Sequence, residues 1–318
     1  MPDSNSSVIV NDLVKRFGDF VAVDHINLET RKGEIFGFLG PNGAGKSTTI
    51  RMLCGLLKPT SGRAIVAGYD VSREPESVRQ NIGYMSQKFS LYDDLKVIEN
   101  IRLFAGLYSV PSSQLDERIA WAVEMSNLKG QEGLITGTLP GGWKQRLALA
   151  CAVLHKPPII FLDEPTSGVD PISRRQFWDL IHQMASEGVT IFVTTHYMEE
   201  AEYCNRLALI FRGKMVALGT PTELKRDSMK GDLLVVECEP LGPAVDALQS
   251  APEVMDAAVF GSALHLLVRD AESAIPKVKR FLTEHGVTLR RVEKIDPTLE
   301  DVFVSLIAES SRGKERAS

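Results

Sequence analysis

The sequence predicts an α/β fold in which short buried strands alternate with helices around a glycine-rich loop. Ile35–Leu39 is an apolar run typical of a buried strand, and a helical pattern begins at Thr48. Between them, GPNGAGKS at positions 40–47 matches the pattern G-x-x-x-x-G-K-[ST] of a phosphate-binding loop. Two further apolar runs, Ile159–Leu162 and Val189–Thr195, are separated by a helical segment. This order of strand, loop and helix favours a nucleotide site over a plain glycine-rich turn.

The glycine-rich loop has the chemistry to hold phosphate groups. Gly40, Gly43 and Gly45 allow the backbone to wrap around an anion with its N–H groups pointing inward. The helix that follows points its positive end at the same anion. Lys46 can reach the β- and γ-phosphates, and the Ser47 hydroxyl can bind Mg²⁺. The predicted nucleotide-binding residues here are Gly40, Pro41, Asn42, Gly43, Ala44, Gly45, Lys46, Ser47 and Thr48.

Composition and charge narrow the class of protein. The chain has 318 residues, of which 44% are hydrophobic and 24% charged, as in soluble globular proteins of one large or two ordinary domains. It has no apolar run long enough to span a bilayer and no basic-then-apolar signal at its start. The net charge of -5 argues against a nucleic-acid partner. Four widely spaced cysteines predict reduced thiols in a cytoplasmic protein: Cys54, Cys151, Cys204 and Cys238.

The segment before the glycine-rich loop predicts two strands, Val8–Lys15 and Asp24–Thr30, with a turn at 17–19. Phe17 in this turn has two interpretations. It can stack on an adenine ring, or it can be an ordinary core residue beside a turn. The motifs further along the chain favour stacking.

Beyond the loop, Ile82–Met85 predicts a strand, and Gln87 follows it. An isolated Gln is usually a surface residue. At a strand-to-loop junction in a nucleotide-binding fold, its amide can instead contact Mg²⁺ or the attacking water. Asn100–Tyr108 and Gln114–Leu128 alternate at helical spacing, which predicts a helical subdomain over about residues 88–155.

A pair of glycines precedes the next helix. Leu139, Pro140, Gly141 and Gly142 lead into a helical pattern at Lys144–His155. Adjacent glycines before a helix can form an anion-accepting end. A plain helix start explains the same residues about as well.

Two acids end the apolar run at Ile159–Leu162. Such a strand delivers its carboxylates to the carboxyl edge of a parallel sheet. Asp163 would hold Mg²⁺, and Glu164 would orient or deprotonate the attacking water. A solvated turn is the alternative, which the upstream phosphate loop disfavours. His196 ends the next strand and can contact a γ-phosphate or serve as a structural group.

A second pattern of strands and helices begins near residue 226. Strand and helix patterns over residues 227–308 predict a small α+β module without a catalytic constellation. Residues 309–318 predict a disordered tail. Residues 8–226 therefore form one predicted domain and residues 227–308 a second.

Taken together, the motifs resemble the nucleotide-binding subunit of an ATP-binding cassette (ABC) transporter. The resemblance covers residues 8 to about 226 and rests on the order of the motifs. These are the loop 40–48, Gln87, the signature-like residues 139–143, the acids 163–164, the turn ending in Asp170, and His196. Residues 83–92 and 144–151 are most similar to type-2 exporters. Residues 296–303 resemble the C-terminal domain of drug-exporting members.

The resemblance implies a P-loop ABC-type cassette with an antiparallel β subdomain, a helical subdomain and a C-terminal α+β domain. It implies ATP and Mg²⁺ as cofactors, with Ser47, Gln87 and Asp163 at the metal and Glu164, His196 and Gln87 as catalytic residues. Phe17 would stack on adenine where many relatives have Tyr. Nucleotide contacts would also come from Leu139, Pro140, Gly141, Gly142 and Asp170.

The implied assembly is a head-to-tail pair of cassettes, identical or paralogous, at the cytoplasmic face of the membrane. Integral membrane permease subunits would be the partners, and ATP hydrolysis would power efflux of a drug-like or other small molecule. A soluble ABC ATPase of translation or DNA repair is the alternative. It is disfavoured because the chain has neither a second cassette nor long coiled coils. Pro140 departs from the family signature, which usually has Ser there.

Overall fold

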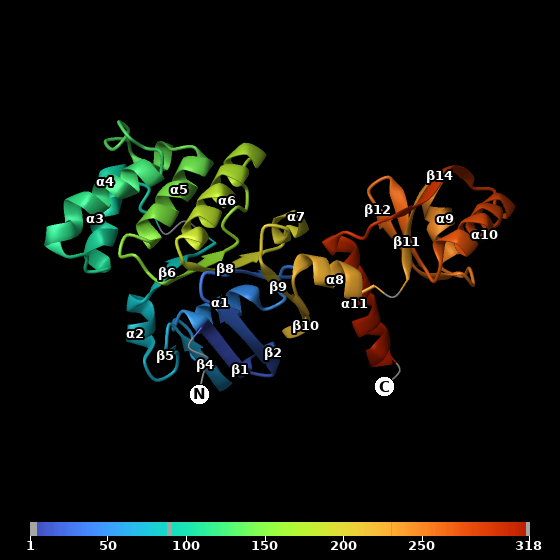
Figure 1. Ribbon diagram of the computed structural model, residues 1–318, viewed down its shortest axis with the longest axis horizontal. Coiled ribbons are helices and arrows are strands. Elements are labelled where there is room, and N and C mark those ends of the chain that lie inside the picture. Colours follow the sequence, from blue (N-terminus) through green and yellow to red (C-terminus); the bar gives the residue numbers. More distant parts are fainter. Residues whose placement is uncertain (1–4, 88–90, 230, 316–318) are drawn as a thin grey trace. The chain divides into compact units, whose positions relative to one another are not determined.

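The computed structural model describes residues 5–87, 91–229 and 231–315 (Figure 1). Its contacts divide the chain into two compact units, an N-terminal unit that ends at Thr220 and a C-terminal unit that begins at Pro221. The border predicted from the sequence lies near residue 226. Helix α8 (Pro221–Asp227) belongs to the C-terminal unit because it packs on α11 (Leu299–Glu315).

The main sheet of the N-terminal unit has six strands in the order β10-β9-β3-β8-β7-β6. Five strands run parallel to one another, in the order β9, β3, β8, β7 and β6. The edge strand β10 is antiparallel to β9. Every residue of β3, β7 and β8 is buried, as in a parallel sheet with both faces covered, and β3 and β7 are accordingly apolar over almost their whole length. The strands are β3 (Ile35–Leu39), β6 (Ile82–Met85), β7 (Ile159–Asp163), β8 (Thr190–Thr195), β9 (Arg206–Phe211) and β10 (Lys214–Gly219).

A second, antiparallel sheet has the order β2-β1-β4-β5. Its strands are β1 (Ser6–Phe17), β2 (Phe20–Arg31), β4 (Ser61–Val66) and β5 (Tyr69–Asp70). Helix α1 (Lys46–Leu53) contacts strands of both sheets, and its Ile50 is fully buried in their shared core with Phe36 and Phe38. The predicted strands are present. The two-residue β5 is additional, since a run that short gives no periodicity to read.

The predicted helical subdomain consists of α3 (Val97–Leu107), α4 (Leu115–Met125) and α5 (Gly141–Ala152). It has a core of its own, in which Ile101 and Leu147 are fully buried. Two short 3₁₀ turns, Ser112–Gln114 and Thr136–Thr138, join its helices. Residues 88–90, where this subdomain was predicted to begin, lie outside the described residues. The remaining helices of the N-terminal unit are α2 (Pro75–Gln80), α6 (Pro171–Ser186) and α7 (Met198–Ala201).

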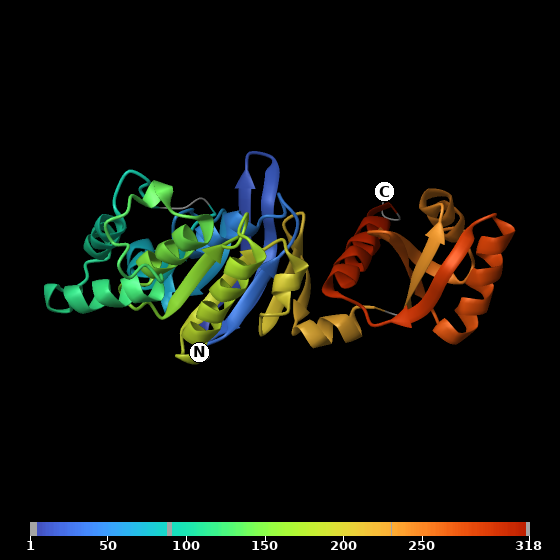
Figure 2. The same ribbon diagram turned by 90° about the horizontal axis from the view of Figure 1, so that it is seen from above.

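The C-terminal unit is an α+β module whose sheet has the order β12-β13-β11-β14. Its chain order is the split β-α-β-β-α-β arrangement, drawn in orange to red in Figure 2. Helices α9 and α10 contribute to one buried core. The elements are β11 (Asp232–Glu239), α9 (Leu241–Leu248), β12 (Val254–Phe260), β13 (Ala263–Val268), α10 (Ala271–Glu284) and β14 (Thr288–Ile295).

The end of the chain differs from the sequence prediction. Helix α11 was expected to stop at Ala308, with a disordered tail over 309–318. In the structure it continues to Glu315, and no proline interrupts residues 309–315. Among the described residues, no helix is both long and apolar enough to cross a membrane.

Candidate nucleotide-binding site

The glycine-rich loop joins the carboxyl end of β3 to the amino end of α1. Two of its glycines, Gly40 and Gly45, are required by close contacts with neighbouring strands. A Cβ at Gly40 would lie 2.3 Å from the Ile210 carbonyl oxygen, and one at Gly45 would lie 2.4 Å from that of Ala22. Gly45 also has φ of 108°, which disfavours other residues. The loop is therefore held between β2 and β9.

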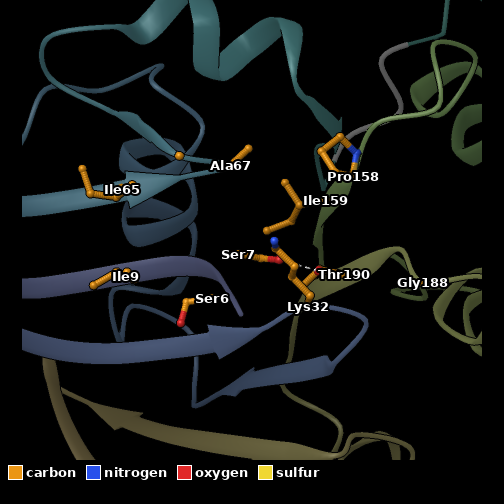
Figure 3. Close-up of a pocket in the computed structure, with 11 residues that line it drawn as sticks. Ser6, Ser7, Ile9, Lys32, Ile65, Ala67, Pro158, Ile159, Gly188 and Thr190 are labelled. Atoms are coloured by element: carbon orange, nitrogen blue, oxygen red, sulfur yellow. Dashed lines mark hydrogen bonds between the residues drawn. The ribbon is translucent and has the colours of Figure 1, made fainter. Parts of the chain in front are cut away.

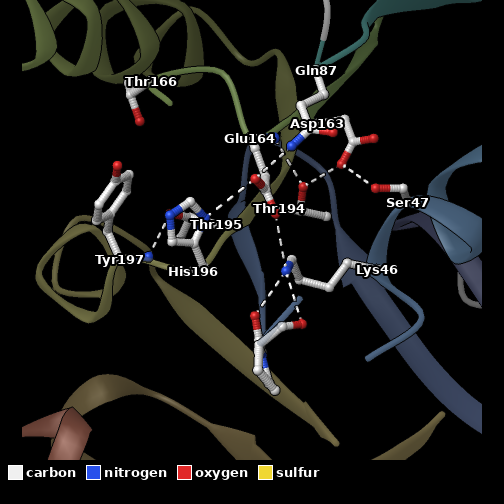
Figure 4. Close-up of polar contacts among 12 residues, drawn as sticks. Lys46, Ser47, Gln87, Asp163, Glu164, Thr166, Thr194, Thr195, His196 and Tyr197 are labelled. Atoms are coloured by element: carbon white, nitrogen blue, oxygen red, sulfur yellow. Dashed lines mark hydrogen bonds and ion pairs between the residues drawn. The ribbon is translucent and has the colours of Figure 1, made fainter. Parts of the chain in front are cut away.

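Lys46, the first residue of α1, points back into this loop (Figure 4). Its Nζ donates to the carbonyl oxygens of Gly40 at 2.8 Å and Pro41 at 3.2 Å. It also lies 3.0 Å from Glu164 Oε1, and both side chains are almost completely buried. A buried ammonium is held in place when carbonyl and carboxylate oxygens surround it.

Asp163, the last residue of β7, faces the first turn of α1. Its Oδ1 accepts from Ser47 Oγ at 3.1 Å and from Thr194 Oγ1 at 2.7 Å. Asp163 is aligned with Thr194 in the parallel pairing of β7 and β8.

The Cys54 thiol has a raised pKa, mainly because it is buried and also because the Asp163 carboxylate is nearby. All four cysteines are free and buried, as predicted.

Glu164 sits at a sharp turn directly after β7. Its φ is 49°, an uncommon value for a residue with a side chain, and such strain gathers at functional sites. The backbone N–H of Glu164 holds this turn by donating to the Thr194 carbonyl at 3.1 Å and to Thr194 Oγ1 at 3.0 Å. As a result, the carboxylate turns back toward Lys46.

Two further predicted residues meet the second oxygen of Glu164. Gln87 Nε2 donates to Glu164 Oε2 at 2.9 Å. His196 Nδ1 lies 3.2 Å from the same oxygen, but its geometry does not make a hydrogen bond. The structure thus gathers Lys46, Gln87 and His196 around one buried carboxylate.

A cleft of about 410 Å³ opens beside this cluster. It is lined by Phe20, Ala22, Asn42, Gly43, Gly45, Lys46, Ser47, Thr48, Gln87 and Glu164. Phe20 was not predicted, and the predicted Phe17 is its partner across the β1–β2 hairpin. Both rings are at least half exposed. Only the pairing of the hairpin strands could have indicated Phe20.

A second cavity of the N-terminal unit, about 470 Å³, lies elsewhere (Figure 3). It is at the opposite edge of the sheet, where Ile159 begins β7 and Thr190 begins β8. The hydroxyls of Ser7 and Thr190 lie 2.7 Å apart and satisfy each other. Ligands of open parallel sheets bind at the carboxyl ends of the strands, so the smaller cleft is the stronger candidate.

The signature-like residues 139–142 and Asp170 meet at Ser173. They are not among the contacts described above for Lys46, Asp163 and Glu164. Pro140 precedes α5, and Leu139 is buried in the helical subdomain. A Cβ at Gly142 would lie 2.4 Å from Ser173 Oγ. The backbone N–H of Ser173 donates to Asp170 Oδ1 at 3.0 Å. Hydrogen bonds from Ser173, chiefly from its side chain and then from its backbone N–H, lower the pKa of Asp170.

The donor set fits a metal that is shared with a phosphate ligand. Among the described residues, no three His, Cys, Asp or Glu side chains gather as a protein cage for a metal ion. One carboxylate, Asp163, lies beside one hydroxyl, Ser47. Mg²⁺ is commonly bound by one or two carboxylates together with substrate phosphates.

Comparison with known proteins decides the family. The ABC transporter family model matches residues 23–167, and the model for the C-terminal domain of DrrA1-3-like ATP-binding proteins matches residues 219–307. The daunorubicin resistance ATP-binding protein DrrA3 of Streptomyces coeruleorubidus is 34% identical over 317 residues, covering 99% of this chain and 100% of that protein. The chain belongs to the ABC transporter ATP-binding proteins. Nod factor export ATP-binding protein I of Cupriavidus metallidurans is 36% identical, covering 94% of this ABC protein and 96% of its own length.

This chain spans well under half the length of a third relative. The probable multidrug ABC transporter ATP-binding protein YbhF of Escherichia coli is 55% identical over 217 residues, which are 68% of this chain but 38% of YbhF. Among solved structures, CbiO1 of Clostridium perfringens has a TM-score of 0.65 at 28% identity, covering 70% of this chain and 92% of that one. The cassette MJ0796, solved as a dimer with ADP and Pi, has a TM-score of 0.61 at 26% identity, covering 67% and 98%.

Proposed function

We propose that this ABC protein hydrolyses ATP and thereby powers export of a small molecule through partner membrane subunits. The observation that carries the proposal is the buried cluster at the carboxyl ends of β3, β7 and β8. There Glu164 contacts Lys46, Gln87 and His196, and Asp163 accepts from Ser47. The cluster places a potential base, a cation and metal-binding oxygens beside one cleft.

Lys46 would exchange partners when ATP binds. Its ammonium now contacts Glu164 and the loop carbonyls, and the β- and γ-phosphates would compete for it. That exchange would release one oxygen of Glu164 to accept a proton from the attacking water. ATP binding would in this way prepare the base.

The remaining residues of the cluster would orient the reacting groups. Gln87 and His196 both face the Glu164 oxygen opposite Lys46, from where they would position the water and the γ-phosphate. Ser47 and Asp163 would hold Mg²⁺. When bound, the ion would stabilise negative charge on the phosphate oxygens.

A second cassette would complete the site. The N–H groups of Gly141 and Gly142 lie in the first turn of α5, where a helix leaves donors unpaired. With Asp170 beside them through Ser173, they form a surface that would face the ATP of the partner cassette. Two cassettes would therefore enclose two ATP molecules.

The proposed partners are integral membrane permease subunits, and the proposed location is the cytoplasmic face of the membrane. Two observations support export over translation or DNA repair. The relatives that match nearly the whole chain are named for Nod factor export and daunorubicin resistance. The C-terminal unit matches the C-terminal domain of DrrA1-3-like proteins.

Co-purification and an ATPase assay test the proposal together. A tagged chain, expressed in its native host and isolated from solubilised membranes, should bring down a polytopic membrane protein. The complex should release phosphate from ATP only when Mg²⁺ is present. A chain that stays in the cytosolic fraction, without ATPase activity in either fraction, would contradict the proposed function.

A further inference from the structure

A buried acid outside the predicted site occupies the short helix α7. Glu200 is 1% exposed, and nothing in the sequence pattern assigns it a role. Its Oε1 accepts a hydrogen bond from Thr166 Oγ1. Its Oε2 is buried and has no hydrogen-bond partner among the described residues. A carboxylate is costly to bury, so its contacts require an explanation.

The bond between Glu200 and Thr166 joins helix α7 to the segment that follows Glu164. Thr166 is 1% exposed and lies two residues after Glu164 in the sequence. Glu200 lies in the helix that directly follows His196 and Tyr197, and its backbone N–H donates to the Tyr197 carbonyl at 3.1 Å. One side chain therefore connects the segment of the base to the segment of the histidine.

Helix α6 supplies a third point of attachment. Arg174 Nε lies 3.5 Å from Glu200 Oε1, too poorly aligned for a hydrogen bond but close enough for charge attraction. The same guanidinium lies over the Tyr197 ring at 4.3 Å. Its Nη2 donates weakly to the Val169 carbonyl at 3.4 Å. Arg174 thus supports Glu200 from one side and the loop after His196 from the other.

We propose that Glu200 is a positioning residue for ATP hydrolysis, which sets the place of His196 relative to Glu164. The inference rests on the proposed function. Glu200 contacts neither His196 nor Glu164, so it acts through Thr166 and the Tyr197 backbone. The spacing that it controls is the 3.2 Å between His196 Nδ1 and Glu164 Oε2. Displacement of a reacting group by about 1 Å is enough to cost up to about a hundredfold in rate.

Two pairs of variants separate positioning from folding. Thr166→Val removes the donor while keeping the shape, and Thr166→Ser keeps the hydroxyl. Glu200→Ala removes the acceptor. The control is Glu199→Gln, because Glu199 neighbours Glu200 on α7 but is exposed. For each form we would measure kcat, KM for ATP, ATP affinity and melting temperature.

We expect Thr166→Val and Glu200→Ala each to lower kcat by about tenfold or more, with KM and ATP affinity within about twofold of wild type. Thr166→Ser and Glu199→Gln should retain wild-type kcat. The Thr166→Val/Glu200→Ala double variant should be no slower than the slower single variant, because each substitution removes the same hydrogen bond between Thr166 and Glu200.

Other outcomes overturn the inference in distinguishable ways. If both removal variants keep wild-type kcat, Glu200 does not position the catalytic loops. If the losses multiply in the double variant, or if ATP affinity and melting temperature fall together with kcat, Glu200 only stabilises the fold. If wild-type protein hydrolyses no ATP, the proposed function itself fails and this inference fails with it.

Discussion

Lys46 Nζ and Glu164 Oε1 lie 3.0 Å apart, with 4% and 6% of their side chains exposed. The contact links the phosphate-binding loop to the acid that follows β7. A buried pair of this kind contributes little net stability, but removing one partner strands the other charge away from water. The pair therefore makes the two functional groups depend on each other before any nucleotide binds.

Breaking this pair should destabilise the protein in the absence of nucleotide. We expect Lys46→Met to lower the free energy of unfolding by about 3 to 5 kcal/mol, and Lys46→Met/Glu164→Gln to recover part of the loss. Urea-induced unfolding of the N-terminal unit measures both changes in the free energy of unfolding. The control is Lys214→Met in the same unit, which breaks the pair between the exposed Lys214 and Asp24 and should cost about 1 kcal/mol or less. Equal losses for the two lysine variants would show that the buried pair has no special cost.

Phe17 should provide the adenine platform at the tip of the β1–β2 hairpin. Base-aromatic stacking is worth about 1 to 3 kcal/mol, so Phe17→Ala should weaken ATP binding about tenfold. Phe20→Ala is the matched variant, since Phe20 is aligned with Phe17 in the same hairpin and lines the cleft. Titration with a fluorescent ATP analogue gives both affinities. A larger loss for Phe20→Ala would transfer the platform to Phe20.

Pro140 should be compatible with an active ATPase. It removes a hydroxyl and an N–H from the signature-like loop. Its carbonyl nevertheless accepts from the N–H groups of Trp143 at 3.0 Å and Lys144 at 3.1 Å, so α5 starts regularly. The N–H groups of Gly141 and Gly142 remain as donors. Pro140→Ser should therefore change turnover by no more than about tenfold. An inactive wild type that only Pro140→Ser rescues would show that these donors are insufficient.

The C-terminal unit should be dispensable for binding ATP. Every residue that lines the cleft beside Lys46 precedes Thr220, where the N-terminal unit ends. A chain that ends at Thr220 should fold cooperatively and bind ATP within about threefold of the full chain, a difference below 1 kcal/mol. Circular dichroism and the same nucleotide titration would test this. A folded, shortened chain that fails to bind ATP would contradict the division of the chain.

Features that depend on a continuous stretch of sequence were predicted correctly. Apolar runs located β3, β7 and β8, and the glycine spacing located the loop between β3 and α1. Thr194 and Glu200 could not be predicted, because each is one residue in an ordinary strand or helix. Thr194 supports Asp163 only through the register of β7 against β8. Glu200 meets Thr166 only when two loops distant in sequence come together. Such contacts come from pairing and packing, which have no local signature.

The proposed catalytic role of Glu164 is tested most directly by phosphate release from ATP by wild-type protein and Glu164→Gln, measured with Mg²⁺ and the membrane partner present. The amide can still orient water but cannot accept its proton, so turnover should fall by about a hundredfold or more. ATP affinity should be retained, and the variant should accumulate as an ATP-bound dimer in gel filtration. Glu124→Gln, at an exposed position of α4, should behave as wild type. Hydrolysis by Glu164→Gln at near wild-type rate would remove Glu164 from the role of base and contradict the account.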